Sequence, residues 1–228
     1  TNTQADYGGA VYCMDSSSDF ENCTFSDNNA QYSAGAMRNN RSSTVLTSSI
    51  VWANNSQLTN TESQVWISYS DLQDCFDNSM QWNSDYGIDQ GGNIDTDPLF
   101  VKSGDYHLAS TVGWWDWQTL AFRQSDLQSP CIDTGDPQSE YCREFWPHGQ
   151  RVNMGAYANT TQAAMSLFSA GDISDLNCDS SINLIDFAQL ASQWNKTGIL
   201  ILEDINGDQK LDWKDLDILT QNWLNSSD

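Results

Sequence analysis

The first two thirds of the chain alternate apolar and polar residues in short runs, and Ser, Asn, Asp and Gly separate these runs. Alternation of this kind is typical of β-strands with one buried face. The run at 8–29 aligns with the run at 34–55 at an offset near 25, and a third run at 64–73 continues the pattern. The alignment places Gly9 on Ala34, Tyr12 on Met37, Phe20 on Val45 and Phe25 on Ile50.

A repeat of this length predicts a solenoid, because one turn of short strands cannot bury its own face and must stack on its neighbours. Small residues, with Asn and Ser at the turns, favour a parallel β-helix of two or three turns. A β-sandwich with similar hairpins is the alternative. The first coil of a short β-helix has an open backbone edge. We expect upstream coils, a cap or another subunit to cover it.

Residues 93–157 stop repeating and are expected to be strand-and-turn segments that close the solenoid. Their series "NIDTDPLFV", "GDYHL", "SPCIDTGDP" and "RVNMGAY" resembles the "choice-of-anchor" segment of large secreted right-handed β-helix proteins, which are abundant in planctomycete-like bacteria. The resemblance covers residues 8–160. It implies a right-handed β-helix, an extracellular or cell-surface location and an attachment device further along the chain. The run at 111–128 is longer and more aromatic than the resemblance predicts.

The pattern changes between Ala163 and Gly171, where strand-like alternation gives way to two helical patterns, each behind an acidic loop. We therefore predict a β-helix with its capping region over 1–165 and a small α-helical domain over 171–228. Apolar residues at i, i+3, i+4 and i+7 indicate that each helix is amphipathic. The two faces comprise Phe187, Leu190, Ala191 and Trp194 in 187–194, and Leu216, Leu219, Thr220 and Trp223 in 216–223.

The two acidic loops run from Asp175 to Asp186 and from Asp204 to Asp215, and they match residue by residue. Side-chain oxygens occupy loop positions 1, 3, 5, 9 and 12 in both copies, position 7 offers a backbone carbonyl, and apolar position 8 (Ile182 or Leu211) is expected to pack inward. Hard cations such as calcium take six to eight oxygen ligands, so we predict two calcium ions rather than zinc or magnesium. The predicted ligands are Asp175, Asn177, Asp179, Ser181, Asn183 and Asp186, then Asp204, Asn206, Asp208, Lys210, Asp212 and Asp215.

An Asp at the last ligand position, in loop-then-helix units without a leading helix, resembles a type I dockerin over residues 172–225. The resemblance implies a protein partner such as a cohesin-like domain, chosen by loop positions 10 and 11. These positions hold Leu184 and Ile185, then Trp213 and Lys214, which are bulkier than the hydroxyl pairs of well-known dockerins. The partner is therefore expected to be a cohesin-like domain, the protein's own β-helix or a second copy of this chain.

The first loop is less regular than the second. Cys178 stands at position 4, where a small residue is common, and Ser180 stands at position 6, where Gly is usual. We expect the first site to be strained or weaker. Removal of calcium should leave the clustered carboxylates to repel one another, so we expect folding of this domain to depend on the metal.

The amino-acid composition reduces the classes of possible binding partner further. The 228 residues carry 31 Asp and Glu against 9 Lys and Arg, for a net charge of −22. That balance argues against nucleic acid or an anionic membrane surface as a partner, and no apolar run is long enough to span a membrane. Ten Trp and eight each of Tyr and Phe can supply a core, so we reject disorder.

Six cysteines without a C-x-x-C pair favour disulfides over zinc and support an extracellular setting. Cys131 and Cys142 are close enough in sequence to close one loop, although a different pairing or free thiols are equally consistent with the spacing. Six sequons are candidate N-glycosylation sites, although many sequons arise by chance in a chain so rich in Asn, Ser and Thr. They begin at Asn22, Asn40, Asn54, Asn159, Asn195 and Asn225.

Candidate catalytic residues are few. A polysaccharide lyase needs cationic residues near a base, but no carboxylate cluster lies beside Arg38 and Arg41 in the sequence, and His107 is expected to pack as a structural residue. We do not expect an enzyme. An aromatic insert is the better candidate for a binding surface, because indole rings stack on sugars or dock into neighbours; it also fits a folded-back core plug. Its residues are Trp114, Trp115, Trp117 and Phe122.

The sequence therefore predicts an extracellular calcium-binding structural or adhesive protein. The dockerin-like domain would attach it to a partner or drive calcium-dependent self-assembly into a filament or surface layer. Two alternatives are a dockerin-bearing polysaccharide lyase or glycoside hydrolase fragment, and a carbohydrate-binding module that uses the aromatic insert.

Overall fold

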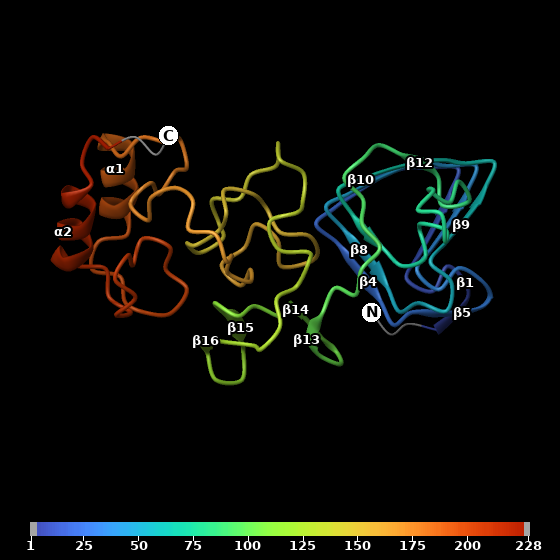
Figure 1. The fold of residues 1–228 in the computed structure, drawn as a ribbon, viewed down its shortest axis with the longest axis horizontal. Helices are drawn as coiled ribbons and strands as arrows, with labels where there is room; N and C mark the ends of the chain where they lie inside the picture. The colour runs from blue at the N-terminus through green and yellow to red at the C-terminus, as the bar shows by residue number, and fades with distance from the viewer. Residues whose placement is uncertain (1–3, 226–228) are drawn as a thin grey trace.

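The structure of this protein is a computed structural model, which describes residues 4–225. The molecule is elongated (Figure 1). A β-solenoid forms one end, a loop-rich middle region (residues 95–170) follows, and a helical module (residues 171–225) forms the other end. The solenoid strands are β1 (Gln4–Tyr7), β2 (Val11–Met14), β3 (Ser17–Glu21), β4 (Thr24–Ser26), β5 (Asn29–Ser33), β6 (Met37–Asn40), β7 (Ser43–Thr47), β8 (Ile50–Trp52), β9 (Leu58–Thr61), β10 (Gln64–Ser68), β11 (Asp71–Leu72) and β12 (Ile88–Asp89).

The solenoid strands form parallel sheets in which successive coils lie side by side. Strand orders are β1-β5, β2-β6-β9, β3-β7-β10-β12 and β4-β8-β11. This arrangement amounts to about three turns, with β12 starting a partial fourth. The coils overlie one another as a roughly triangular outline in Figure 1. The prediction of a parallel solenoid is confirmed, and the third run at 64–73 does form strands β10 and β11.

The register between the first two coils differs from the predicted one by one residue. Phe20 pairs with Leu46, not Val45, and Phe25 pairs with Val51. The predicted alignment of Phe25 on Ile50 is therefore wrong for the same reason. Side chains alternate along a strand, so a shift of one residue exchanges the inner and outer faces. Accordingly, Leu46 is buried inside the coil whereas Val45 is exposed.

Residues in the left-handed backbone region mark the bends between strands. Asp15, Arg41 and Glu62 occupy the first bend of the three coils, with φ values of 47°, 49° and 50°. Hydroxyl ladders hold neighbouring bends together: the Ser16 N–H donates to Ser42 Oγ, and the Ser42 N–H donates to Ser63 Oγ. These bonds satisfy backbone donors that the turning chain removes from the sheets.

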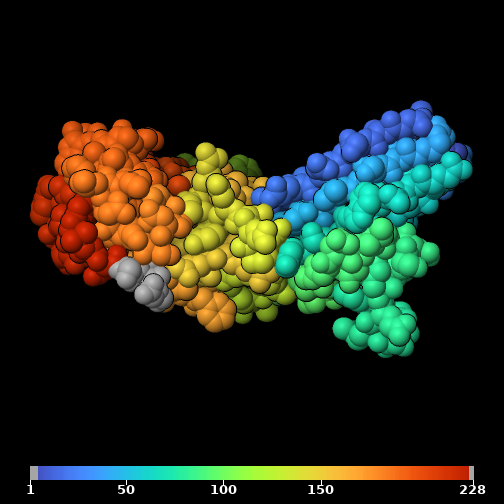
Figure 2. Space-filling view, turned by 90° about the horizontal axis from the view of Figure 1, so that it is seen from above, coloured from blue at the N-terminus to red at the C-terminus, as the bar shows by residue number. Residues whose placement is uncertain are grey.

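The inside of the solenoid is apolar. Buried residues from three of the four solenoid sheets meet there, including Met37, Leu46, Val65 and Leu72. An excursion of the chain over 74–87 closes the end of this core, because Phe76, Trp82 and Tyr86 pack against it. This excursion carries the lobe that protrudes beside the coils in Figure 2. It was not predicted from the sequence.

The middle region covers one side of the solenoid, which corrects the expectation that it closes the end. It contains two antiparallel hairpins, β13 (Phe100–Lys102) with β14 (Asp105–Leu108) and β15 (Trp114–Asp116) with β16 (Ala121–Arg123). Its contacts reach all three coils. The Ala156 N–H donates to Thr24 Oγ1, the Gly155 N–H donates to the Ser48 carbonyl, and the Cys131 thiol donates to Asp71. Ile50 on the outer face of β8 packs with Leu108, Ile132 and Met154.

The helical module contains α1 (Leu184–Ser192) and α2 (Trp213–Gln221). Within residues 4–225, neither helix has the length and apolar character that a membrane crossing requires. A small core joins the two halves, and Ile182 and Leu211 are buried in it as predicted. The predicted helix faces are only partly correct. Leu190 and Leu219 are fully buried, but Phe187 and Trp194 are 38% and 41% exposed.

Candidate calcium loops and the cavity beside them

The two acidic loops of the helical module adopt the same local structure. The first loop (Asp175–Asp186) is bridged at Ile182 to the chain after α2: the Ile182 N–H donates to the Asn225 carbonyl, and the Leu224 N–H donates to the Ile182 carbonyl. The second loop (Asp204–Asp215) is bridged at Leu211 to the chain after α1 in the equivalent way, through Asn195 and Lys196. The module is therefore an internal duplicate in which each loop supports the other half.

The last residue of each loop is a buried carboxylate that ties the loop together. Asp186 Oδ1 accepts from the Leu176 N–H at 2.8 Å, and Oδ2 accepts from the Asn183 N–H at 2.8 Å. Asp215 accepts from the Asn206 and Asp212 N–H groups at 3.1 and 2.9 Å. Both carboxylates are completely buried, and neither forms a salt bridge within residues 4–225. A buried carboxylate without a positive partner is costly, so the chemistry at this position fits a bound cation.

The first residue of each loop also accepts backbone N–H groups in the same pattern. Asp175 accepts from Asp179 and Ser180, and Asp204 accepts from Gly207, Asp208 and Gln209. Burial is the main cause that raises the pKa of both carboxyls, Asp175 and Asp204, above the ordinary value. The N–H contacts oppose this effect, because they stabilise the ionised form.

Other contacts occupy the fifth position of each loop. The Asn177 side-chain amide donates to Asp179 Oδ2 at 2.9 Å, and Lys214 Nζ lies 2.5 Å from Asp208 Oδ2. The hydrogen bond from Lys214 is the largest cause that lowers the pKa of the Asp208 carboxyl. Within residues 4–225, no three His, Cys, Asp or Glu side chains gather closely enough to form a metal site by themselves. The predicted donor sets also include Asn side chains and the carbonyls of Ser181 and Lys210.

The backbone is left-handed at positions 4 and 6 of both loops. Gly207 takes this conformation at position 4 of the second loop, and Cys178 and Ser180 take it in the first, with φ of 55° and 67°. Gln209 takes it at position 6 of the second loop, with φ of 66°. A side chain other than glycine costs about 1 kcal/mol in this region. The first loop has two such residues and the second has one.

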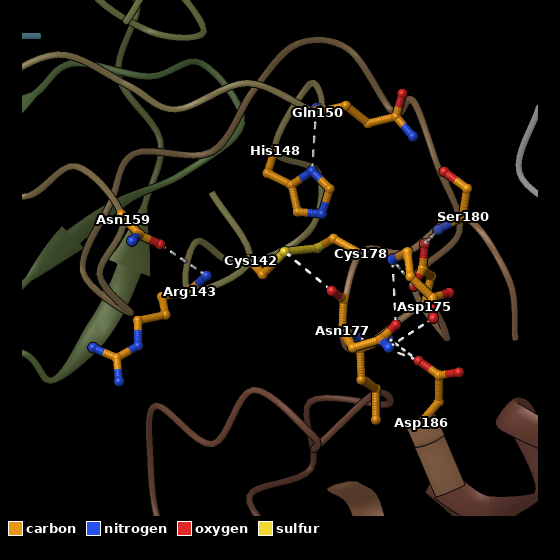
Figure 3. Close-up of a disulfide and its surroundings, with 12 residues drawn as sticks. Cys142, Arg143, His148, Gln150, Asn159, Asp175, Asn177, Cys178, Ser180 and Asp186 are labelled. Atoms are coloured by element: carbon orange, nitrogen blue, oxygen red, sulfur yellow. Dashed lines mark hydrogen bonds between the residues drawn. A yellow bond between two sulfur atoms is a disulfide. The ribbon is translucent and has the colours of Figure 1, made fainter. Parts of the chain in front are cut away.

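The disulfide corrects the predicted pairing. Cys142 bonds to Cys178 and not to Cys131, so a covalent bridge links the middle region to position 4 of the first loop (Figure 3). Cys131 is a buried thiol that donates to Asp71 Oδ2 at 3.1 Å. Cys131 lies where the middle region contacts β11, and this packing places it away from Cys142. The short sequence spacing contained no signal for this separation.

The predicted partner-binding residues lie on the outside of the helical module. Leu184 is 70% exposed, Ile185 56% and Trp213 66%, and Lys214 is also exposed. They do not pack on the preceding region. Leu184 and Trp213 are equivalent positions in the two halves, as are Ile185 and Lys214, so each half presents one bulky pair to solvent.

The aromatic insert forms the β15–β16 hairpin and divides its predicted residues between different environments. Trp115 is buried and packs edge-on against Phe122, with ring centres 5.3 Å apart. Trp114 is partly buried, whereas Trp117 is 58% exposed. The insert is thus mostly a packed hairpin, which agrees with the plug alternative more than with a flat aromatic platform.

The predicted glycosylation residues also differ in their environments. Asn195 and Asn225 are exposed, whereas Asn22, Asn40 and Asn159 are partly buried. The prediction of a glycan at Asn54 is wrong. It is buried, and its amide donates to the Phe25 carbonyl and to Gln57 Oε1, so it is a structural bend residue and not a glycan acceptor in this fold.

A cavity of about 350 Å³ lies between the middle region and the helical module. It is lined by Glu144, by Trp146, by the first residue of each acidic loop (Asp175 and Asp204) and by the Cys142–Cys178 disulfide. Sequence reasoning did not single out Glu144 or Trp146, because nothing in their local pattern indicates burial beside a distant loop.

The fold and these loops define a mainly β protein, with a parallel β-solenoid, a loop-rich middle region and a duplicated loop–helix module. Comparisons with models of known protein families, with curated proteins and with solved structures give no match.

Proposed function

We propose that this protein is an extracellular calcium-binding structural or adhesive protein whose dockerin-like helical module attaches it to a protein partner. The observation that carries this proposal is the duplication of one acidic loop: the same five oxygen-bearing positions, the same buried final carboxylate and the same bridge to the opposite half occur twice. A right-handed β-helix of the secreted, surface-attached kind would be the body that the module attaches.

Calcium suits the loops because their candidate ligands are oxygens only. The buried carboxylates of Asp186 and Asp215 supply negative charge, and neither forms a salt bridge among the described residues. Calcium would neutralise this charge and hold the first turn of each helix to its loop.

The exposed pairs on the two halves support a protein partner. Leu184, Ile185 and Trp213 remain in solvent although they are large and apolar. Leu184 and Ile185 form an adjacent apolar pair at the start of α1, and Trp213 stands at the equivalent start of α2. Contiguous exposed apolar surface marks interaction sites. The partner is a cohesin-like domain or a second copy of this chain.

Calcium titration of the full chain tests the proposal. We expect two calcium ions per chain by isothermal titration calorimetry, and a lower melting temperature of the helical signal when a chelator removes calcium. Asp186→Asn and Asp215→Asn should each abolish one site, because an amide loses the charge and keeps only one of the two acceptor oxygens. Asp217→Asn, on the exposed side of α2, is the matched control and should keep both sites.

Sedimentation with and without calcium separates the two partners. Calcium-dependent growth in mass that Trp213→Ala removes would identify a second copy of the chain. A protein that stays monomeric in millimolar calcium would exclude self-assembly. No calcium uptake by the unaltered chain would refute the proposed function as a whole.

A further inference from the structure

The cavity between the middle region and the helical module has the size of a small-molecule site, at about 350 Å³. Aromatic rings form its wall on the middle region. Trp115, Phe122 and Phe145 pack edge-to-face in series, with ring centres 5.3 and 5.6 Å apart. This series makes a rigid wall, because each ring is held by the next.

The opposite wall is the beginning of both acidic loops. Asp175 and Leu176 come from the first loop, and Asp204 and Ile205 occupy the same two positions of the second. The Cys142–Cys178 disulfide also lines the cavity and joins its two walls covalently. The close-up in Figure 3 shows this bridge beside His148 and Asp175.

The lining carries negative charge and no positive side chain. Carboxylates of Asp172, Asp175 and Asp204 contribute to it, the carboxyl of Glu144 also lines the cavity, and the lining contains neither Lys nor Arg. His148 is the remaining titratable base, and burial lowers the pKa of its imidazole, so it is neutral at physiological pH. A cavity with carboxylates and aromatic faces attracts cations by charge and by cation–π contact.

Glu144 is the most unusual group in this lining. The residue is 3% exposed. Its Oε1 accepts from the Asn153 and Asn159 N–H groups at 3.1 and 2.8 Å, while Oε2 has no hydrogen-bond partner among residues 4–225. Burial raises the pKa of the Glu144 carboxyl to about 8, so this group is mostly protonated at neutral pH, and a cation bound beside it would favour its ionised form. Buried polar atoms almost always have a partner. Oε2 lacks one among the described residues, and the charge of an ammonium group placed beside it would supply it.

We propose that this cavity binds a small organic cation, an ammonium ion with apolar substituents, between the aromatic wall and the carboxyls of Glu144 and Asp172. The apolar substituents contact Phe122 and Phe145, and the charge is met by the acidic groups. This site is separate from calcium attachment. Asp172 and Glu144 lie outside the predicted calcium ligands, so the cavity keeps the Asp172 carboxylate and the ionisable Glu144 carboxyl when calcium engages Asp175 and Asp204.

Choline and 3,3-dimethylbutan-1-ol test the charge of the ligand, because the two molecules share one shape and differ only in the charged nitrogen. Calorimetric titration of the full chain in millimolar calcium should give choline binding that is at least about tenfold tighter than binding of the alcohol. Equal binding of the two molecules, or tighter binding of the alcohol, would overturn the proposal in favour of a neutral ligand. Absence of binding by both would overturn it as well.

Variants locate the site. Glu144→Gln keeps the acceptor for the two N–H groups but cannot ionise beside a bound cation, and should weaken choline about tenfold while leaving the alcohol unchanged. Asp172→Asn provides a second charge variant in case the first does not fold. Asp126→Asn makes the same charge change at an exposed position that does not line the cavity, and should bind choline like the unaltered chain. Choline binding that both cavity variants retain in full would refute the assignment.

Two further measurements separate the sources of the cation and the two proposals. A peptide that carries trimethyllysine, titrated in parallel, would bind tighter than choline if the cation belongs to a protein, and weaker if it is a free molecule. Calcium titration of the same variants should still show two ions. Loss of calcium binding with intact choline binding contradicts the proposed function only, and the reverse contradicts this inference only.

Discussion

Asp71 is the residue whose environment differs most from what its sequence context indicates. It lies at the start of β11, is completely buried, and accepts hydrogen bonds from the Thr96 N–H and the Cys131 thiol. Burial is the largest cause that raises the pKa of its carboxyl to about 7, from an ordinary 3.8. The nearby carboxylates of Asp95 and Asp97 add to this effect.

The raised pKa predicts a loss of stability with pH. The folded protein keeps the Asp71 proton up to about pH 7, whereas the unfolded chain releases it near pH 4. The contribution of Asp71 to the free energy of unfolding is therefore complete below about pH 4 and is lost as the pH rises towards 7. Asp71→Asn is neutral throughout, so its stability relative to the unaltered chain should rise with pH by at most about 1.4 kcal/mol per unit.

Denaturant unfolding at several pH values between about 4 and 8 measures this difference. Asp19→Asn, on the exposed face of β3, is the control and should show no such trend. A pH-independent difference between Asp71→Asn and the unaltered chain would contradict the prediction.

Single residues show the limits of sequence reasoning. The alternation of polar and apolar residues correctly predicted short strands in the run at 34–55. It did not decide whether Val45 or Leu46 faces inward. The register shifts by one residue within the β1–β5 pair, where Ala5 pairs with Ala30 but Tyr7 pairs with Ser33, and this irregularity carries no apolar signal. Cys131 and Asp71 meet only because distant segments pack together.

At the scale of the element, the loop–helix unit was the best predicted part of the candidate site. Spacing alone gave the matched oxygen positions and the buried residues Ile182 and Leu211. The helices begin three residues earlier than predicted, at Leu184 and Trp213. The reason is a capping box, in which Asn183 and Asp212 cap the helices and the final loop carboxylate returns a hydrogen bond. The Asn/Asp-x-x-Asp pattern of this capping box is visible in the sequence and indicates the earlier helix start.

The second loop holds an ion pair that opposes metal binding. Lys214 Nζ contacts Asp208 Oδ2, one of the proposed calcium ligands. If the loop binds calcium, the lysine must leave this carboxylate first. Lys214→Gln should therefore raise the calcium affinity of the second site about threefold, a size that suits a partly exposed pair.

Calorimetric calcium titration of this variant tests the competition. Lys196→Gln removes the same charge at an exposed position after α1 and should leave both affinities near those of the unaltered chain. Equal calcium affinities for the two variants would show that Lys214 acts through net charge and not through its contact with Asp208.

At the scale of the whole molecule, the order of the parts follows from the sequence but their packing does not. The repeat predicted the solenoid, and the acidic loops predicted the helical module. The middle region was expected at the end of the coils, yet it covers their side through bonds to Thr24, Ser48 and Asp71. These contacts join segments that are far apart in sequence, and no local pattern specifies them.

The Cys142–Cys178 disulfide should determine how firmly the helical module is held. It closes a loop with a sequence separation of 36 residues, and disulfides of this kind stabilise by about 2–4 kcal/mol. A double Cys142→Ser, Cys178→Ser variant should keep the solenoid intact but melt its helical module at a lower temperature. Limited proteolysis near 166–172 should also become faster.

Cys23→Ser is the matched control, because Cys23 is a half-buried free thiol in the solenoid. It should leave both the helical melting and the cleavage near 166–172 unchanged. Cleavage at the same rate in the double variant and the unaltered chain would show that non-covalent packing alone holds the module.

The same disulfide has a mechanical consequence. If the module anchors the body to a partner, a pull on one is transmitted to the other along the shortest covalent path. That path crosses from Cys142 to Cys178 through the sulfur bridge, and the residues between them carry no tension. About 120 Å of extended chain is thereby withheld from the pulling force. Under load the covalent path between body and module therefore stays short, and the loop between Cys142 and Cys178 adds to its length only when the disulfide is reduced.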